Sequence, residues 1–336
     1  SLPSREIIAD SVEVMIQAHR FDGMVLISNC DKVTPGMLMA AARLNVPSIV
    51  VTGGPMRSGI YKGRKVGVSS LFEAVGEVTV GKMNEDELKA LEESACPGYG
   101  SCNGMFTANT MACVAEALGM SLPSCATAHA VSSLKLRIAV SSGERIAEMV
   151  REDLKPSDVM TPKAFENAIM VDVALGGSTN TVLHLSAIAK EADVPLPLTL
   201  FDELSRRVPH LCDMSPGGPY TLEDLDEAGG VPAVMKELSP SLHLDAVTVT
   251  GKTVGENIAQ ASVLNTNVIR PLSNPIHREG GIAMLSGNLA PLGAVVKATA
   301  VSPKILIHRG PAKVFNSEEE AMKALLNGKI REGDVM

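Results

Sequence analysis

The sequence predicts an α/β fold: a helix-rich domain with a parallel sheet flanked by helices, followed by a β-rich domain. Near the start of the chain, short continuous apolar runs alternate with amphipathic helical patterns. Helical patterns then dominate up to residue 241. From residue 242 onward, short β-type runs are separated by Gly, Pro and Asn. We therefore expect two domains, residues 1–241 and residues 242–336.

The first strands and the helix between them define the parallel sheet. Gly23–Ser28 and Pro47–Gly54 are continuous apolar runs, as expected for strands buried on both faces. Thr34–Leu44 has helical spacing, with Thr34 as the expected N-cap. A strand–helix–strand order of this kind predicts parallel pairing through a right-handed crossover.

The remaining elements follow from periodicity and from Gly and Pro punctuation. Further helices are expected at residues 5–20, 84–94, 105–119, 142–154, 161–176, 178–192 and 199–208. Strands of the second domain are expected at residues 244–251, 267–272, 280–287, 294–300 and 304–315.

Composition excludes several classes of protein. The net charge is -8 and aromatic residues make up only 3%, which argues against a nucleic-acid partner. No run of about 18 apolar residues is present, so no membrane partner is expected. With no Trp and 17 Met, the core must consist of aliphatic side chains and Met. The six Cys lack the spacing of a disulfide framework, which favours reduced thiols in the cytoplasm.

Three candidate ligands follow the first strand directly. Cys30, Asp31 and Lys32 lie between that strand and the next helix, which is the usual position of a ligand site in an open α/β sheet. A thiol, a carboxylate and an amine side by side point to a metal or cofactor. A buried Cys followed by an Asp/Lys turn pair is the alternative, and spacing alone leaves it open.

A second candidate is the Gly-rich loop at residues 95–106. Cys102 comes shortly before an expected helix, where thiol pKa values are lowered and metal ligation is favoured. Cys96 and Cys102 do not have the spacing of a zinc site. A loop with incidental cysteines remains the alternative.

A third candidate is the turn that precedes the expected helix at residues 178–192. After two glycines, Ser178, Thr179 and Asn180 place hydroxyl groups and free N–H groups at a helix start, which suits an anionic substrate group. Ordinary capping by Ser178 explains the same pattern.

Together, these segments resemble one family. Five of them, in this order and spread over essentially the whole chain, are similar to the dihydroxy-acid dehydratase/phosphogluconate dehydratase family: SLPSREIIADSVE, NCDKVTPGMLMAA, ACPGYGSCNGMFTANTM, LGGSTNTVLHL and AGGVPAVMKEL. The loop containing Cys102 is closer to the dihydroxy-acid branch than to the phosphogluconate branch.

The resemblance implies cofactors and ligands. It implies an iron–sulfur cluster, 2Fe–2S or 4Fe–4S, held in part by Cys30 and Cys102, with a third cysteine upstream of Ser1. It implies Mg²⁺ held by Asp31 and by Lys32 as a carbamate. The serine base would lie beyond Met336. The other cysteines, Cys96 among them, match no ligand of the family, and we interpret them as small apolar residues.

The resemblance also implies a reaction and an architecture. The expected enzyme is a hydro-lyase that converts 2,3-dihydroxy-3-methylbutanoate-type acids to 2-oxo acids in valine, isoleucine and leucine biosynthesis. Alternatives are a sugar-acid or phosphogluconate dehydratase and an inactive, cluster-free fragment. A homodimer is expected, with a swivelling β-barrel as the second domain. We expect the chain to be a central fragment with only part of that barrel, inactive by itself.

Overall fold

The computed structural model describes residues 2–336 and contains the parallel pair that the sequence predicts. Strand β1 (Met24–Ser28) pairs with β2 (Ser48–Thr52) from Met24↔Ser48 to Ser28↔Thr52. Helix α2 (Val33–Leu44) connects them. Every residue of β2 is buried, but Val25 and Ile27 of β1 are 37% and 68% exposed. The prediction of a strand buried on both faces is therefore wrong for β1, because in residues 2–336 it pairs only with β2 and one of its faces is left open.

The start of α2 also differs from the prediction. The position before the first helical residue belongs to Lys32, and no side chain caps the helix there. Thr34 is not the N-cap; its hydroxyl donates a hydrogen bond to Ser28 Oγ at 2.9 Å. This contact fixes the first turn of α2 against the end of β1 and restrains the loop between them.

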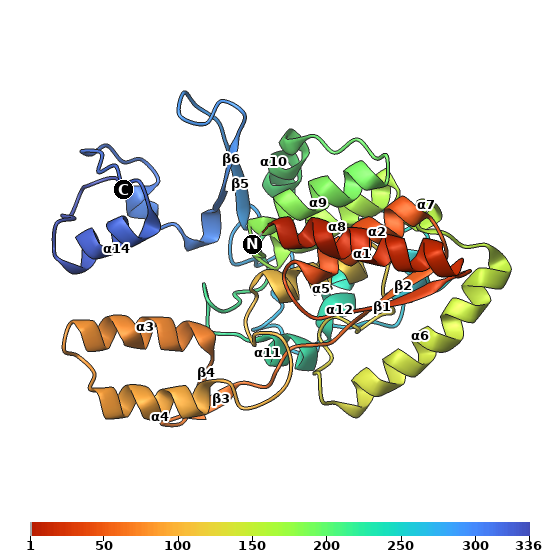
Figure 1. Ribbon diagram of the computed structural model, residues 1–336, viewed down its shortest axis with the longest axis horizontal. Coiled ribbons are helices and arrows are strands. Elements are labelled where there is room, and N and C mark those ends of the chain that lie inside the picture. Colours follow the sequence, from red (N-terminus) through yellow and green to blue (C-terminus); the bar gives the residue numbers. More distant parts are fainter. Residues whose placement is uncertain (1) are drawn as a thin grey trace.

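This pair adjoins a body made of helices (Figure 1). Its helices are α1 (Pro3–His19), α5 (Thr107–Ala117), α6 (Ser133–Glu152), α7 (Pro156–Val159), α8 (Pro162–Ala174), α9 (Asn180–Glu191), α10 (Leu198–Arg207), α11 (Leu222–Glu227), α12 (Gly230–Glu237) and α13 (Val254–Asn257). Helix α1 packs on α2, α2 on α9, and α5 on α8. Phe165 and Phe201 are the largest fully buried side chains, and Met and Ala fill much of the core around them.

An arm projects from the body below the helices (Figure 1). It consists of an antiparallel pair, β3 (Gly59–Tyr61) and β4 (Arg64–Val66), followed by α3 (Val68–Thr79) and α4 (Glu85–Ala95). The sequence analysis predicted α4 and missed α3. The arm has a small core of its own formed by Val66, Ala74, Leu91 and Ala95.

The last part of the chain contains less β structure than predicted. Strands form at β5 (Ile282–Leu285) and β6 (Ala294–Lys297), which pair antiparallel, and the chain continues through 3₁₀ turns at Ala298–Ala300 and Pro303–Ile305 to α14 (Glu318–Leu326). The strands predicted at residues 244–251, 267–272 and 304–315 do not form. Val249 and Ile269 are buried in the helical core instead, so β-branched residues in this region bury apolar surface without pairing as strands.

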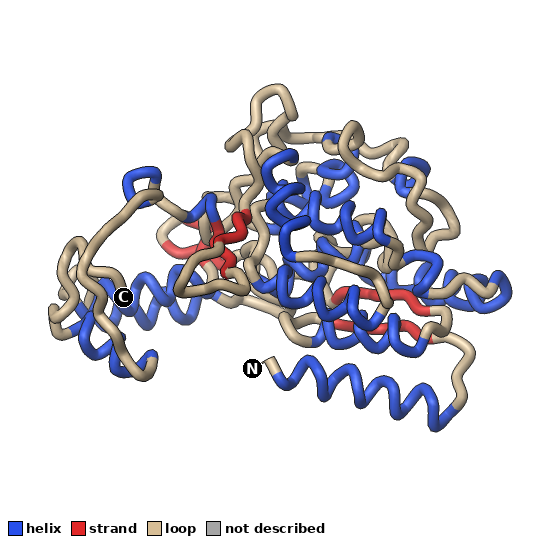
Figure 2. Tube along the Cα trace, turned by 90° about the horizontal axis from the view of Figure 1, so that it is seen from above, coloured by secondary structure: helices blue, strands red, loops and turns tan. Residues whose placement is uncertain are grey.

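The strands are few and the sheets small (Figure 2). Within residues 2–336 there are three two-stranded sheets, and none of them closes. The coarse prediction of a mixed helix and sheet fold is confirmed. No helix in the described part of the chain is both long and apolar enough to cross a bilayer.

Candidate functional site

The loop after β1 holds the first group of candidate ligands. Cys30 is exposed and its thiol lies 3.8 Å from Asp31 Oδ1. Lys32 Nζ donates to Asp31 Oδ2 at 2.8 Å, and its side chain is only 14% exposed. Burial alone would raise the pKa of Asp31, but the hydrogen bond and charge of Lys32 outweigh it and lower that pKa. Asp31 is thus held as an anion at the carboxyl end of β1.

The loop that carries Cys102 lies on the continuation of β2. Met56 N donates to Ser101 O at 2.9 Å, and Ser101 N donates to Gly54 O at 3.0 Å. Gly100 has φ +133°, and a Cβ there would come within 2.3 Å of Met56 N. Only glycine permits so close a backbone approach. The loop is therefore fixed at the same edge of the sheet as the residues that follow β1.

The side chain of Asn109 fixes this loop through hydrogen bonds. Its side-chain amide donates to Cys102 O and, at 2.7 Å, to Gly104 O, while its Oδ1 accepts from Ser101 Oγ at 2.7 Å. Asn109 belongs to α5 and is 1% exposed. A buried amide with three partners in one loop gives that loop a single conformation.

Cys30 acts on the Cys102 thiol through its charge. Burial raises the pKa of the Cys102 thiol, and the ionisable groups of Cys96, Cys30 and Asp31 raise it further through their negative charge. The predicted lowering of this pKa by a helix start is wrong, because α5 begins only at Thr107. Such a thiol favours a cation among its neighbours, since a positive charge would relieve the repulsion.

Cys96 is more exposed than predicted. It was predicted to be a small apolar residue. In the structure it follows the last residue of α4 and is exposed, whereas Cys113, Cys125 and Cys212 are buried as expected.

The start of α9 joins this region through α5. Helix α9 begins at Asn180, with Thr179 in the N-cap position. Ser178 Oγ lies 2.9 Å from Thr107 Oγ1 and accepts from Asn180 N at 3.2 Å. Asn180 Nδ2 donates to Thr107 Oγ1 at 3.1 Å. The first residues of α5 and α9 are therefore side by side, and Ser178 caps as well as links them.

One turn further along α9 is a residue that the sequence analysis missed. His184 is fully buried, and its Nδ1 lies 3.2 Å from Arg5 Nη1. Burial, together with the positive charges of Lys32 and Arg5, lowers the pKa of His184 to about 4. The spacing of four residues from Asn180 was the available signal, because residues at i and i+4 share one face of a helix.

Another buried group lies beneath the turn at residues 176–178. Asp172 of α8 accepts from Thr181 Oγ1 at 2.5 Å, while its Oδ1 has no partner among the described residues. Burial raises the pKa of Asp172 to about 7, although Thr181 and the charge of Lys297 act in the opposite direction.

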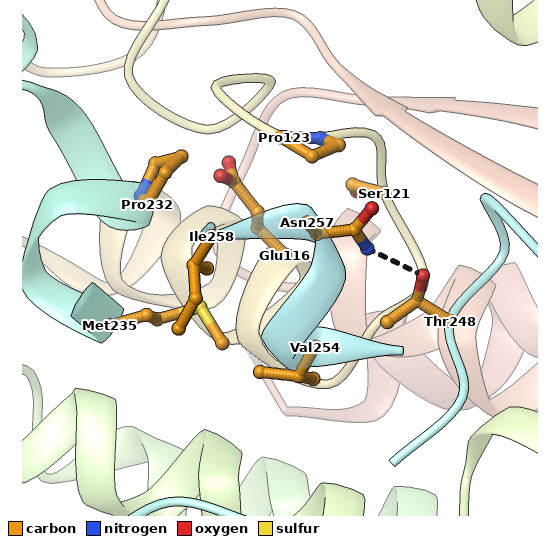
Figure 3. A pocket seen from close by; sticks show the side chains of 9 residues that line it. All are labelled: Glu116, Ser121, Pro123, Pro232, Met235, Thr248, Val254, Asn257 and Ile258. Atoms are coloured by element: carbon orange, nitrogen blue, oxygen red, sulfur yellow. Dashed lines mark hydrogen bonds between the residues drawn. The ribbon is translucent and has the colours of Figure 1, made fainter. Parts of the chain in front are cut away.

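A small pocket in the body is separate from these residues (Figure 3). It measures about 20 Å³, and its lining includes Glu116, Ser121, Thr248 and Asn257. Burial raises the pKa of Glu116 to about 7, and the carboxyl accepts hydrogen bonds from Ser124 N and Ala126 N. None of the predicted site residues lines this pocket.

The donor set at the sheet edge fits part of a cluster site and part of a magnesium site. Cys30 and Cys102 offer sulfur, which suits iron, and Asp31 offers a carboxylate, which suits Mg²⁺. Within residues 2–336, no three His, Cys, Asp or Glu side chains form a metal-binding group on their own. Two thiols and one carboxylate provide only some of the ligands that such sites use.

Comparison with known proteins gives the family context. The model described as dihydroxy-acid/6-phosphogluconate dehydratase N-terminal matches residues 1–257, and its C-terminal counterpart matches residues 267–336. The whole chain is 60% identical to the dihydroxy-acid dehydratase of Methanothermobacter thermautotrophicus, 57% to that of Halothermothrix orenii and 58% to that of Methanosarcina barkeri. It spans 61%, 61% and 62% of the lengths of these relatives.

The role of Asn109 predicts a change in thiol reactivity. Asn109→Ala removes the donors to Cys102 O and Gly104 O, each worth about 1 kcal/mol. We expect alkylation of Cys102 to become roughly tenfold faster, since the loop opens more easily. Peptide mass spectrometry after timed iodoacetamide labelling measures this rate, with exposed Cys30 as the internal reference.

A matched control is Asn167→Ala, which removes hydrogen bonds of a buried Asn to the backbone of His243 in another part of the body. It should leave Cys102 reactivity unchanged. Equal acceleration by both variants would contradict a local role for Asn109.

Burial of Asp172 predicts a pH dependence of stability. A carboxyl whose folded pKa of about 7 lies above its ordinary value of 3.8 holds an extra proton in the folded state between these values. Its contribution to the free energy of unfolding therefore falls as pH rises through this range. Asp172→Asn should remove part of this decline. The stability of the variant relative to the parent should therefore be greater at pH 8 than at pH 4. Urea unfolding at both pH values measures the difference, with exposed Asp193→Asn as the control, and identical pH profiles for Asp172→Asn and the parent would contradict it.

Proposed function

The chain belongs to the dihydroxy-acid/6-phosphogluconate dehydratase family, and from this premise we propose that it functions as a hydro-lyase that converts a 2,3-dihydroxy acid to a 2-oxo acid. The proposed substrate class is 2,3-dihydroxy-3-methylbutanoate and its close relatives, in valine, isoleucine and leucine biosynthesis. The names of the relatives favour this class over sugar acids.

One observation carries the proposal. It is the effect that the charges of Cys30 and Asp31 have on Cys102, which supports a common site where the loops after β1 and β2 lie at one edge of the sheet. Two thiols that are not buried, together with a carboxylate, support a site for both an iron–sulfur cluster and Mg²⁺.

We propose that Cys30 and Cys102 hold a 2Fe–2S or 4Fe–4S cluster, and that Asp31 and carbamylated Lys32 hold Mg²⁺. When bound, these groups supply Lewis acidity for the departing hydroxyl and for the charge that develops next to the carboxylate. Asp31 is suited to its part because Lys32 keeps it ionised. Lys32 needs the modification, since an ammonium group has no lone pair to offer.

The start of α9 is our proposed place for the substrate carboxylate. Ser178, Thr179 and Asn180 lie at the start of α9, where the positive end of the helix dipole attracts an anion. The hydrogen bonds of Ser178 and Asn180 to Thr107 fix this helix start next to the loop of Cys102. The same loops would orient the acid and limit access of water to it.

The broader proposals concern the whole protein. We propose a homodimer in the cytoplasm, where six free thiols remain reduced. We also propose that residues 242–336 contribute to a swivelling β-barrel, of which β5 and β6 are two strands. The division between residues 241 and 242 stays a prediction.

The cofactor proposal predicts a loss of iron on substitution of one thiol. The 336-residue chain, reconstituted anaerobically with iron and sulfide, should bind both and show a visible charge-transfer band. Cys102→Ser should lose most of the iron and the band, because a hydroxyl is a poor ligand for iron in place of a thiolate. Iron, sulfide and absorbance are measured together, with turnover of 2,3-dihydroxy-3-methylbutanoate and of a sugar acid.

Cys96→Ser is the matched control, since Cys96 is an exposed thiol beside the same loop. It should keep its iron. A colourless chain that turns over the substrate would refute the cofactor proposal. Little iron with no turnover would favour the reading of a cluster-free fragment.

A further inference from the structure

A buried nitrogen beside the candidate site lacks a partner. His184 is 0% exposed, and within residues 2–336 its Nε2 makes no hydrogen bond. An unsatisfied polar atom in a protein interior costs free energy, so each such atom calls for an explanation. The other ring nitrogen, Nδ1, is occupied by Arg5.

Arg5 determines which nitrogen of His184 carries the proton. Its guanidinium can only donate, so Nδ1 of His184 must accept from Nη1 across their 3.2 Å contact. The proton of the neutral ring then resides on Nε2, which is a donor. Arg5 cannot turn away easily, because it also donates to Leu183 O at 3.3 Å and to Glu6 Oε1 at 3.0 and 2.7 Å.

Two candidate ligands act on His184 through their charge. Lys32 and Asp31 are among the charges that act on His184, and His184 acts in turn on Asp31. The packing agrees, since a Cβ on Gly36, one turn after Lys32, would lie 2.7 Å from Arg5 O. Helix α2, which begins directly after Lys32, packs on α1, which carries Arg5, and on α9, which carries His184.

The unmodified site offers this donor no suitable acceptor. The ammonium of Lys32 is itself a donor. The oxygens of Asp31 accept from Cys30 and from Lys32, and neither of them is a hydrogen-bond partner of His184 Nε2. A new acceptor on Lys32 would give the Nε2–H group of His184 a hydrogen-bond partner. It would also replace the ammonium cation, which an N–H donor cannot approach favourably.

We propose that His184 is a positioning residue whose Nε2–H donates a hydrogen bond to the carbamate on Lys32. The inference rests on the proposed function, in which that carbamate is a magnesium ligand. Arg5 completes the arrangement by fixing the tautomer, and its charge helps to balance a second anion beside Asp31.

Formation of the carbamate consumes one CO₂ and releases two protons. The Lys32 ammonium releases one proton to solvent and becomes an amine. The amine nitrogen attacks the carbon of CO₂, a C–N bond forms, and one C=O π pair moves onto oxygen. A second proton leaves the nitrogen, so the product is a carbamate with one negative charge. CO₂ in equilibrium with bicarbonate is the only co-reactant, and no oxidation or reduction occurs.

The test measures carbamate directly. The 336-residue chain is titrated with ¹³C-bicarbonate in the presence of Mg²⁺, and the carbamate carbon is followed by ¹³C NMR. In His184→Leu we expect half-saturation at roughly tenfold to a hundredfold more bicarbonate, because a hydrogen bond to a charged group is lost. His184→Gln, which keeps an N–H donor near the Nε2 position, should recover much of this loss. Lys32→Arg should give no signal and identifies the site.

A measurement on the parent chain covers the case in which His184→Leu fails to fold. With ¹⁵N-labelled histidine, the His184 Nε2–H resonance, assigned through His184→Gln, should shift as the carbamate forms. Unchanged carbamate affinity in a folded His184→Leu variant would overturn the role of His184, as would a resonance that does not respond. Absence of any carbamate in the parent chain would instead refute the proposed magnesium site.

Discussion

The candidate site depends on the docking of one loop onto the end of one strand. Backbone hydrogen bonds join Ser101 to Gly54 and Met56, and Gly100 allows the two backbones to approach closely. Because β1 and β2 are parallel, their carboxyl ends lie at the same edge, and residues that follow β1 are brought to the loop that docks after β2. Cys30 and Asp31 therefore lie at the same edge of the sheet as the loop of Cys102, although Cys102 is far from them in sequence.

Helix α9 packs beside both groups of residues at this edge. Its first residue contacts Thr107 next to the loop of Cys102, and its buried His184 contacts Arg5 beside the Asp31–Lys32 pair. One rigid helix thus sets the position of the proposed substrate contacts relative to the proposed metal ligands. Preorganisation of this kind is what a site needs when catalysis depends on position and charge.

Much of this arrangement follows from local sequence rules. The parallel pair, α5, α8, α9 and the position of Cys30 after a strand were predicted because periodicity and edge position depend on a few neighbouring residues. The role of His184 was not, since its partner Arg5 is remote in the chain and only tertiary packing unites them. Thr34 was predicted to cap α2, but Ser28 provides a buried partner for its hydroxyl instead. Val249 belongs to a β-type run, but burial in the helical core determines its conformation.

The central claim, that Cys30 and Cys102 lie within reach of one bound group, has a direct test. A trivalent arsenical can join two thiols only if both reach a single arsenic atom. In a Cys96→Ser variant of the chain the only thiols that are not buried are Cys30 and Cys102. The account predicts one arsenic per chain, with peptides containing Cys30 and Cys102 linked in the mass spectrum of a native digest. Arsenic bound to either thiol alone, with no linked pair in a folded chain, would contradict it.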